Sequence, residues 1–222
     1  MWVTIAMTPT AAAATAEAHV WTSVFLRAEL GTEPTKGPTL WLDLHDRRGA
    51  SGDVFILRPG VGFRSGPWSV IAGYGLVPTL VDDADDLVEH RAWQHVSWSD
   101  ALGDGEHKLA ALARLRFEQR GRSDGPGLNL RARLWLRAAV PIAGPVAALV
   151  WDEAFVRLNG TSWSGPVGFD QNRTFVGLAI TPAPWFRAEL GYQANVVARV
   201  GAPTLWAHTV ATSLVMVSVP KP

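Results

Sequence analysis

The chain has 222 residues, of which 48% are hydrophobic, and its 20 basic side chains balance 20 acidic ones. This balance gives no reason to expect a nucleic-acid partner, and the absence of cysteine excludes disulfide frameworks, thiolate metal sites and cysteine nucleophiles. No apolar run reaches the roughly 20 residues of a transmembrane helix.

The first 18 residues, MWVTIAMTPTAAAATAEA, are mostly small and apolar and carry no positive charge. Ala14 and Ala16 form an A-x-A arrangement typical of a signal-peptide cleavage site, although the basic start of a signal peptide is missing. We therefore expect residues 1–18 to be a signal-peptide remnant, cleaved near Ala16 or Ala18, and residues 19–218 to form the folded domain. A disordered Ala-rich N-terminus is the alternative.

From His19 onward, apolar and polar side chains alternate with a period of two, which predicts β-strands rather than helices. Clusters rich in Gly, Pro, Ser and Asp separate the alternating segments and predict turns. Most segments exceed the about five or six residues of an average globular strand and reach the roughly nine to eleven of a tilted membrane-spanning strand. The expected strands lie at residues 19–30, 39–47, 53–64, 67–78, 87–99, 107–120, 128–140, 145–158, 168–180, 184–199 and 204–218.

This pattern predicts an all-β fold: a single antiparallel, up-and-down transmembrane β-barrel of 10 to 12 strands. Eleven segments fit such a barrel poorly, because bacterial single-chain outer-membrane barrels use even numbers of strands. We therefore expect one segment to be misassigned or hidden, with 12 strands slightly favoured over 10.

Several predicted strands have one apolar face and one face with full charges, as between Leu112 and Arg120, where arginine and glutamate alternate with leucine and phenylalanine. A soluble barrel also alternates, with its charged face in water, so alternation alone does not decide which face is outside. The 17 Arg against 3 Lys favour ion pairs shielded from water, because the guanidinium group is weakly hydrated and binds carboxylates in a bidentate manner. A lipid-facing Arg would cost about 2–4 kcal/mol at the membrane midplane. We therefore expect the charged faces to line the barrel lumen.

The inward-pointing charges are expected to form an ion-pair lattice that fills much of the narrow lumen as a structural polar core. An Arg-lined narrow passage or pocket for small anionic solutes is the alternative. The expected lattice residues are Arg91, Arg114, Arg116, Glu118, Arg120, Arg131, Arg133, Arg137, Glu153, Arg173 and Glu189. Other side chains expected to point inward are Arg27, Arg47, Arg157, Arg187, Arg199, Glu29, Asp43 and Glu89.

Tryptophan is concentrated near the ends of the predicted strands, as an interfacial girdle in a membrane barrel requires. The girdle residues expected from this position are Trp21, Trp41, Trp68, Trp98, Trp185 and Trp206.

Six segments resemble, in order and spacing, a bacterial family known as domain of unknown function 2490 (DUF2490). They are EHRAWQHVSW (89–98), RLRFEQR (114–120), RARLWLR (131–137), WDEAFVRLNG (151–160), FDQNRTFVGL (169–178) and AELGYQANVV (188–197), and the resemblance covers about Val20 to Met216. It implies a secreted Gram-negative protein that forms an outer-membrane barrel, with no established activity. The chain departs from that pattern at its uncharged start and at VMVSVPKP, which lacks a terminal aromatic residue.

The family-motif residues that the resemblance singles out are Asp170, Gln171, Asn172, Arg173, Glu89 and Trp93. FDQNR could organise a polar site at the barrel rim. We favour the simpler interpretation, in which Asp170 and Asn172 shape the turn while Gln171 and Arg173 join the lumen lattice.

No catalytic residue, metal site or cofactor is expected. His90, His95, His107 and His208, with Ser97, Ser99 and Ser213, are the possible parts of a hydrolase site, but the chain has no Gly-x-Ser-x-Gly motif. Strand alternation places His90 and His95 on opposite faces, against a zinc site.

The sequence thus predicts a porin-like barrel of the bacterial outer membrane that contacts lipid and is structural or forms a narrow, anion-preferring passage. A lipid-modifying barrel enzyme, with a Ser or Asn beside a His at the rim, is one alternative. A soluble lipocalin-like binding barrel, with its leucine faces turned inward, is the other. The solute, the orientation and the oligomeric state stay open.

Overall fold

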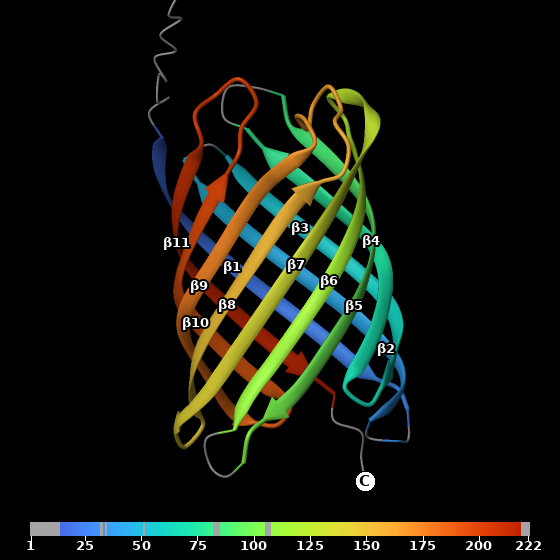
Figure 1. Cartoon of the computed structure of the whole chain (residues 1–222), viewed down its shortest axis with the longest axis vertical. Coiled ribbons are helices and arrows are strands. Elements are labelled where there is room, and N and C mark those ends of the chain that lie inside the picture. Colours follow the sequence, from blue (N-terminus) through green and yellow to red (C-terminus); the bar gives the residue numbers. More distant parts are fainter. Residues whose placement is uncertain are drawn as a thin grey trace, which may run out of the picture.

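Each of the eleven alternating segments forms a β-strand, and the strands close into a barrel (Figure 1). The computed structural model describes residues 14–31, 33, 35–50, 52–81, 85–104 and 108–218. The strands are β1 (Thr15–Glu29), β2 (Lys36–Gly49), β3 (Asp53–Ser65), β4 (Trp68–Leu80), β5 (Leu87–Leu102), β6 (Leu109–Arg122), β7 (Gly125–Ala143), β8 (Val146–Arg157), β9 (Gly168–Ala183), β10 (Phe186–Val197) and β11 (Leu205–Val217).

The sheet is mixed, because the first and last strands pair in parallel. Every other neighbouring pair is antiparallel and consecutive in the chain, whereas β1 pairs with β11 from Thr15↔Leu205 to Arg27↔Val217. The expected barrel of 10 to 12 strands with consecutive strands paired up and down is confirmed, but it has 11 strands rather than the favoured 12 and is not antiparallel at the β1–β11 seam. An odd number of alternating strands brings the first and last strands together pointing the same way, so closure requires a parallel seam.

Strand β1 begins at Thr15, inside the segment 1–18 that composition assigns to a leader. Residues 1–13, with most of that segment, lie outside the described residues. The signal peptide therefore stays a prediction. Among the described residues, no helix is long and apolar enough to cross a membrane.

The odd strand number also places the two ends of the strand system at opposite ends of the barrel (Figure 1). We call the end at which β1 starts the upper end, and the end at which β11 finishes the lower end. The lower end carries two-residue turns after β3 and β7, in which Gly66 and Gly144 adopt left-handed φ values of 57° and 52°. The upper end carries the longer connection between β8 and β9.

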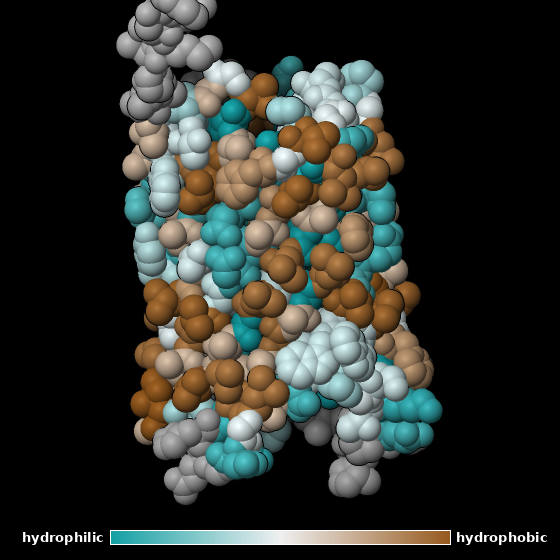
Figure 2. Space-filling model, viewed as in Figure 1, coloured by the Kyte–Doolittle hydropathy of each residue, from teal (hydrophilic) through white to brown (hydrophobic). Residues whose placement is uncertain are grey.

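Charged side chains point into the barrel and apolar side chains point out. Within β6, Arg116 and Glu118 are each 1% exposed, while their neighbours Leu115 and Phe117 are 39% and 43% exposed. Figure 2 shows hydrophobic side chains distributed over the visible outer wall. This arrangement is the reverse of a soluble barrel, in which the apolar face is buried.

The outer wall also carries a hydrogen-bonded polar group midway along β8 and β9. Asp152 accepts hydrogen bonds from Asn172 Nδ2 at 3.0 Å and from Thr174 Oγ1 at 2.6 Å. Its carboxylate is thus satisfied by neighbouring protein groups rather than by solvent alone.

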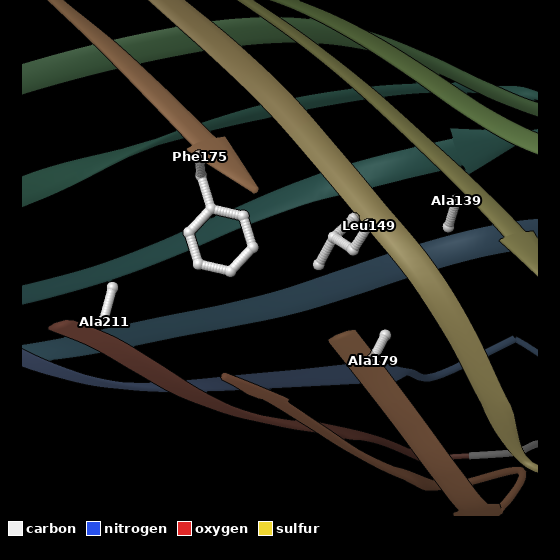
Figure 3. Close-up of a cluster of buried hydrophobic side chains, with 5 residues drawn as sticks. All are labelled: Ala139, Leu149, Phe175, Ala179 and Ala211. Carbon is white, nitrogen blue, oxygen red and sulfur yellow. The ribbon is translucent and has the colours of Figure 1, made fainter. Parts of the chain in front are cut away.

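An apolar cluster occupies part of the inner surface, so the interior is not charged throughout. It consists of Ala139, Leu149, Phe175, Ala179 and Ala211, which come from β7, β8, β9 and β11 (Figure 3). Trp151 packs against this cluster, with its ring stacked on that of Phe175 at a centroid distance of 5.2 Å.

Candidate functional site

The register of neighbouring strands places opposite charges next to one another inside the barrel. Glu118 of β6 lies directly opposite Arg131 of β7, and Glu153 of β8 lies directly opposite Arg173 of β9. Directly opposed side chains in an antiparallel pair have Cβ atoms about 4.5–5.5 Å apart. Alternation within each strand therefore turns the charged side chains inward, and the register between strands places opposite charges next to one another.

Glu118 is the centre of this network. Its Oε2 accepts hydrogen bonds from Arg131 Nε at 2.9 Å and from Arg131 Nη2, and its Oε1 accepts one from Arg133 Nη1. Arg58 of β3 reaches across the lumen to within 3.9 Å of the same Oε1. A single buried carboxylate thus connects arginines from opposite walls.

Two further carboxylates extend the network along β8 and β9. Glu153 Oε1 accepts from Arg133 Nη2 at 2.7 Å and lies 3.5 Å from Arg114 Nη2. Asp170 accepts from Arg131 Nη1 at 2.9 Å and from Arg157 Nη1 at 2.7 Å. Most of the lattice arginines therefore bridge two acceptors or one acceptor and an aromatic ring.

The upper end of the lumen is filled by side chains and by the connection between β8 and β9. Glu89 accepts from Arg91 Nε at 2.6 Å and from Arg120 Nη2 at 2.9 Å. Asn129 is fully buried and donates to Ser164 Oγ of the connection at 3.1 Å. Trp163 of the same connection stacks over the Arg120 guanidinium group at 5.4 Å.

Outside the strands at this end, Arg122 donates a hydrogen bond to Asp124 in the β6–β7 turn, which lowers the pKa of that carboxyl group.

At mid-height the lumen is crossed by a large aromatic side chain. Trp93 is 0% exposed, and a Cβ added at Gly60 or Gly73 would lie 2.6 or 2.5 Å from its indole ring. The guanidinium group of Arg116 lies over the same ring at 4.6 Å and its Nη2 donates to His95 Nδ1 at 3.2 Å. The two glycines are thus required because the indole occupies the space that their side chains would need.

The interior contains a serine, a histidine and an aspartate, but not in the order that nucleophilic catalysis needs. Ser23 Oγ lies 2.8 Å from His45 Nδ1, and Arg58 Nη2 lies 2.9 Å from His45 Nε2. Because a guanidinium group can only donate, Nε2 is the acceptor and Nδ1 carries the proton that it donates to Ser23. The imidazole therefore cannot take a proton from this serine.

The lumen also contains a cavity of about 460 Å³, here called the lower chamber, whose lining does not include Trp93. Exposed residues of its lining, Asp100, Ala101 and Ala110, place its mouth at the lower end of the barrel. Arg137 Nη2 and Arg187 Nε donate to Glu189 Oε1 at 3.0 and 2.7 Å within this lining. Its lining also includes Phe175 and Ala211 of the apolar cluster.

The structure brings the expected lattice residues together, with each of them in the barrel interior. Arg116 differs from the rest because it has no carboxylate partner among the described residues. Arg199 lies outside the network, where its Nε donates to the Pro203 carbonyl at 2.8 Å and its Nη2 donates to Thr15 Oγ1. Gln171 accepts from Arg173 Nη2 at 3.1 Å, as the simpler interpretation of FDQNR expects.

Sequence reasoning missed two members of the network. Asp170 was assigned to a turn, but a register shift between Phe155 and Val156 turns its side chain into the lumen. Arg58 alternates with proline and apolar residues in β3, so its strand lacks a clear charged face. The expectation that Asn172 shapes a turn is also wrong, because it lies within β9 and binds Asp152 on the outer wall.

Two of the six expected girdle tryptophans lie inside the barrel. The Trp21 ring lies under the Arg47 guanidinium group at 4.2 Å, and Trp41 Nε1 donates to Asp43 at 3.4 Å. Both lie on the same strand faces as the interior charges. Their position near strand ends suggested the girdle, but the face of the strand decides on which side of the wall they lie. Trp68, Trp185 and Trp206 are exposed on the outer wall, and Trp98 lies opposite Trp68 in the sheet.

Among the described histidines and serines considered for catalysis, no Ser–His hydrogen bond is found. His90 and His208 contact the hydroxyl groups of Tyr74 and Tyr192 on the outer wall. Ser97 Oγ lies 2.7 Å from Ser69 Oγ, and His107 lies outside the described residues. Within the described part of the chain, no cluster of three metal-binding side chains is found.

Comparison with known proteins identifies relatives by sequence. Residues 18–204 match the family described as "Protein of unknown function (DUF2490)". An uncharacterized protein of Methylorubrum extorquens strain AM1 is 36% identical over 154 residues, which span 68% of this chain and 66% of that protein. The chain thus covers slightly less than two thirds of that relative. No solved structure matches the chain.

Proposed function

This chain belongs to the family DUF2490, and we propose that it is a bacterial outer-membrane β-barrel whose narrow, arginine-rich lumen accepts small anionic solutes. The proposal has two parts: where the barrel resides, and what its interior does. Each part rests on a separate feature of the barrel and has its own experiment.

The membrane location is supported by the reversed polarity of the barrel. In β7, Leu134 is 46% exposed, whereas Arg133 beside it is 4% exposed and bound to two carboxylates. Water outside would leave the leucine solvated, whereas a lipid surrounding would remove such side chains from water at about 25 cal/mol per Å² of apolar area. Strands of 12 to 19 residues also exceed the roughly nine to eleven that a tilted strand needs to span a bilayer.

The outer aromatic residues support the same location. Trp68 follows the β3–β4 turn and Trp185 lies in the β9–β10 turn, both at the lower end, while Trp206 is near the start of β11 at the upper end. Tryptophan is enriched at both membrane–water interfaces, where its amphipathic ring lies at headgroup level. The outer wall between these positions is the proposed lipid-facing band.

A narrow lumen rather than a porin-wide channel follows from the filled interior. Glu89, Glu118 and Asp170 hold arginines from several strands across the barrel. The lower chamber has eight arginines and four carboxylates in its lining. Positively charged linings favour anions in pores, so we expect little conductance overall and a preference for anions in what remains.

The two other functional classes are less well supported. A soluble lipocalin-like binder requires the leucine faces to turn inward, and Leu115 and Leu134 are exposed on the outer wall. A lipid-modifying enzyme requires a histidine that can accept a serine proton, and His45 instead donates to Ser23 because Arg58 occupies its Nε2.

The location is tested by expressing the chain behind a complete signal peptide in a Gram-negative host. We expect it to fractionate with outer membranes and to migrate differently on a gel before and after heating, as folded membrane barrels do. A folded, soluble protein in the periplasmic extract would contradict the proposal.

The lumen is tested separately by planar-bilayer recording of the purified barrel. We expect a conductance far below that of a general porin, with chloride more permeant than potassium. A large conductance or a preference for potassium would contradict the proposed anion-preferring narrow lumen.

A further inference from the structure

The lower chamber has more arginines than the carboxylates of its lining can neutralise. Eight arginines face four carboxylates, and these carboxylates already have donors. Asp43 accepts from Arg58 at 2.7 Å, and Glu189 accepts from two arginines. Glu29 and Glu118, which lie outside the lining, pair with Arg27 and Arg133. The chamber is left with a smaller surplus of positive charge.

Arg47 shows this surplus most clearly. Its guanidinium group lies over Trp21 at 4.2 Å and has no carboxylate partner within the described residues, and its Nε is buried without a hydrogen bond. The charged groups that act on it most strongly are other arginines, Arg173 first and Arg58 second. A buried cation without a partner is costly, and an anion in the chamber would remove that cost.

Two neighbouring arginines of the lining are also incompletely paired. Arg114 has one carboxylate contact, at 3.5 Å from Glu153, and its Nε is buried without a hydrogen bond. Arg173 is 8% exposed, lies 3.9 Å from Glu153 and likewise has a buried, unpaired Nε. Three guanidinium groups of one cavity thus each have an Nε–H group without an acceptor in the protein.

Aromatic and apolar side chains of β7, β8, β9 and β11 also line the chamber, among the charged residues. Phe175 is 3% exposed, its ring lies parallel to that of Trp151 within 3°, and Trp135 meets Trp151 edge to face at 6.2 Å. Phe175 belongs to the apolar cluster that Figure 3 shows with Leu149 and three alanines. These side chains give the chamber flat apolar surface among the charged residues that the same strands contribute to its lining.

We propose that the lower chamber is a binding site for an organic anion that joins an acidic group to an aromatic body, such as an aromatic carboxylate. The acidic group would bind the Arg47, Arg114 and Arg173 guanidinium groups, and the aromatic body would pack against Trp151 and Phe175. A cavity of about 460 Å³ suits a small molecule of this kind, because ligand sites typically measure about 300–1,000 Å³.

This inference rests on the proposed function and adds the end of the barrel through which the anion enters and leaves. Because the exposed lining residues Asp100, Ala101 and Ala110 lie at the lower end of the barrel, the ligand enters and leaves through that end. A free inorganic anion would satisfy the arginines but would leave the apolar surface of the chamber unused, which favours the organic anion.

The test is binding of 2-naphthoate to the barrel refolded in detergent, with heat-modifiable migration as the check of folding. We expect saturable calorimetric binding of one 2-naphthoate per barrel. Acetate, which lacks the aromatic body, and 2-naphthylmethanol, which lacks the charge, should each bind at least about tenfold more weakly, since charge-assisted hydrogen bonds and ring burial each contribute more than 1.4 kcal/mol.

The matched variants are Arg47→Gln in the chamber and Arg48→Gln beside it, where the side chain is exposed on the outer wall. Arg47→Gln should weaken 2-naphthoate binding at least about tenfold while leaving the melting temperature unchanged or higher, because Arg47 lacks a carboxylate partner. Arg48→Gln should bind like the unmodified chain.

Equal binding by the two variants, no binding of 2-naphthoate to the heat-modifiable barrel, or equal affinity for acetate and 2-naphthoate would each overturn this inference. A different result would contradict the proposed function: the chain would stay soluble on fractionation, whether or not it binds 2-naphthoate. A barrel that resides in outer membranes and does not bind 2-naphthoate therefore refutes the chamber site alone.

Discussion

Replacing Glu118 with glutamine removes the negative charge at the centre of the interior network. The carboxylate is 1% exposed and accepts three hydrogen bonds from Arg131 and Arg133. Glutamine keeps one acceptor oxygen, but its amide group would point two donors at the other guanidinium group. Breaking a buried ion pair by removing one partner costs about 3–5 kcal/mol, so we expect Glu118→Gln to lower the free energy of unfolding by that amount.

The assay is urea unfolding of the barrel in lipid vesicles, with the folded fraction measured from its heat-modifiable gel band. Asp124→Asn is the matched control, because it removes a carboxylate from an exposed ion pair with Arg122 in the β6–β7 turn. Exposed pairs contribute about 0–1 kcal/mol. If Glu118→Gln cost no more than Asp124→Asn, the reasoning that the network stabilises the barrel would be refuted.

A double-mutant cycle separates the pair from its surroundings. Arg131→Gln combined with Glu118→Gln should cost less than the sum of the single changes, by about 0.5–3 kcal/mol, as contacting residues do. Additive effects would mean that the two groups act independently despite the 2.9 Å hydrogen bond between them.

Three further changes test the packing, the outer face and the topology. Gly73→Ala would place a Cβ 2.2 Å from the Pro59 carbonyl oxygen and 2.5 Å from the buried indole ring, and should cost about 1–3 kcal/mol of unfolding free energy. Gly121→Ala, with nothing within 4 Å, should be nearly neutral in the same urea titration. Leu134→Arg should cost about 2–4 kcal/mol if its outer-wall position lies in the lipid midplane, and a negligible cost in vesicles would contradict the lipid-facing assignment. Because the chain has no cysteine, Asp104→Cys at the lower end and Ala202→Cys at the upper end give single labelling sites. A membrane-impermeant maleimide applied to intact cells should label only one of them, and labelling of both would exclude a spanning barrel.

Many features of this barrel follow from the sequence because they depend on short-range geometry. A period of two assigns each side chain of a strand to one of two faces, so Arg116 and Glu118 were placed together and Leu115 and Phe117 opposite them. The predominance of arginine over lysine indicated that the charged face is the shielded one. These local rules predicted eleven strand segments and most members of the interior network, although not Arg58 and Asp170, without any knowledge of their pairing.

Other features depend on how distant strands meet, and local patterns do not contain that information. The parallel β1–β11 seam is a property of closure, because strand direction at the seam depends on the total number of strands rather than on any one of them. Trp21 lies near a strand end like the outer tryptophans, and its position under Arg47 follows from the face that its strand turns inward. Asp170 joins the network through a register shift that two strands create together.

The surplus of arginine in the lower chamber is likewise a tertiary property. The chain as a whole is neutral, and the sequence alone determined only that arginines and carboxylates alternate with apolar residues along β-strands. Which arginine receives a carboxylate depends on strand register and on contacts across the lumen, since ion pairs form over a few ångströms in space. The register of β6 and β7 places Glu118 beside Arg131 and Arg133, whereas Arg47 lies beside other arginines.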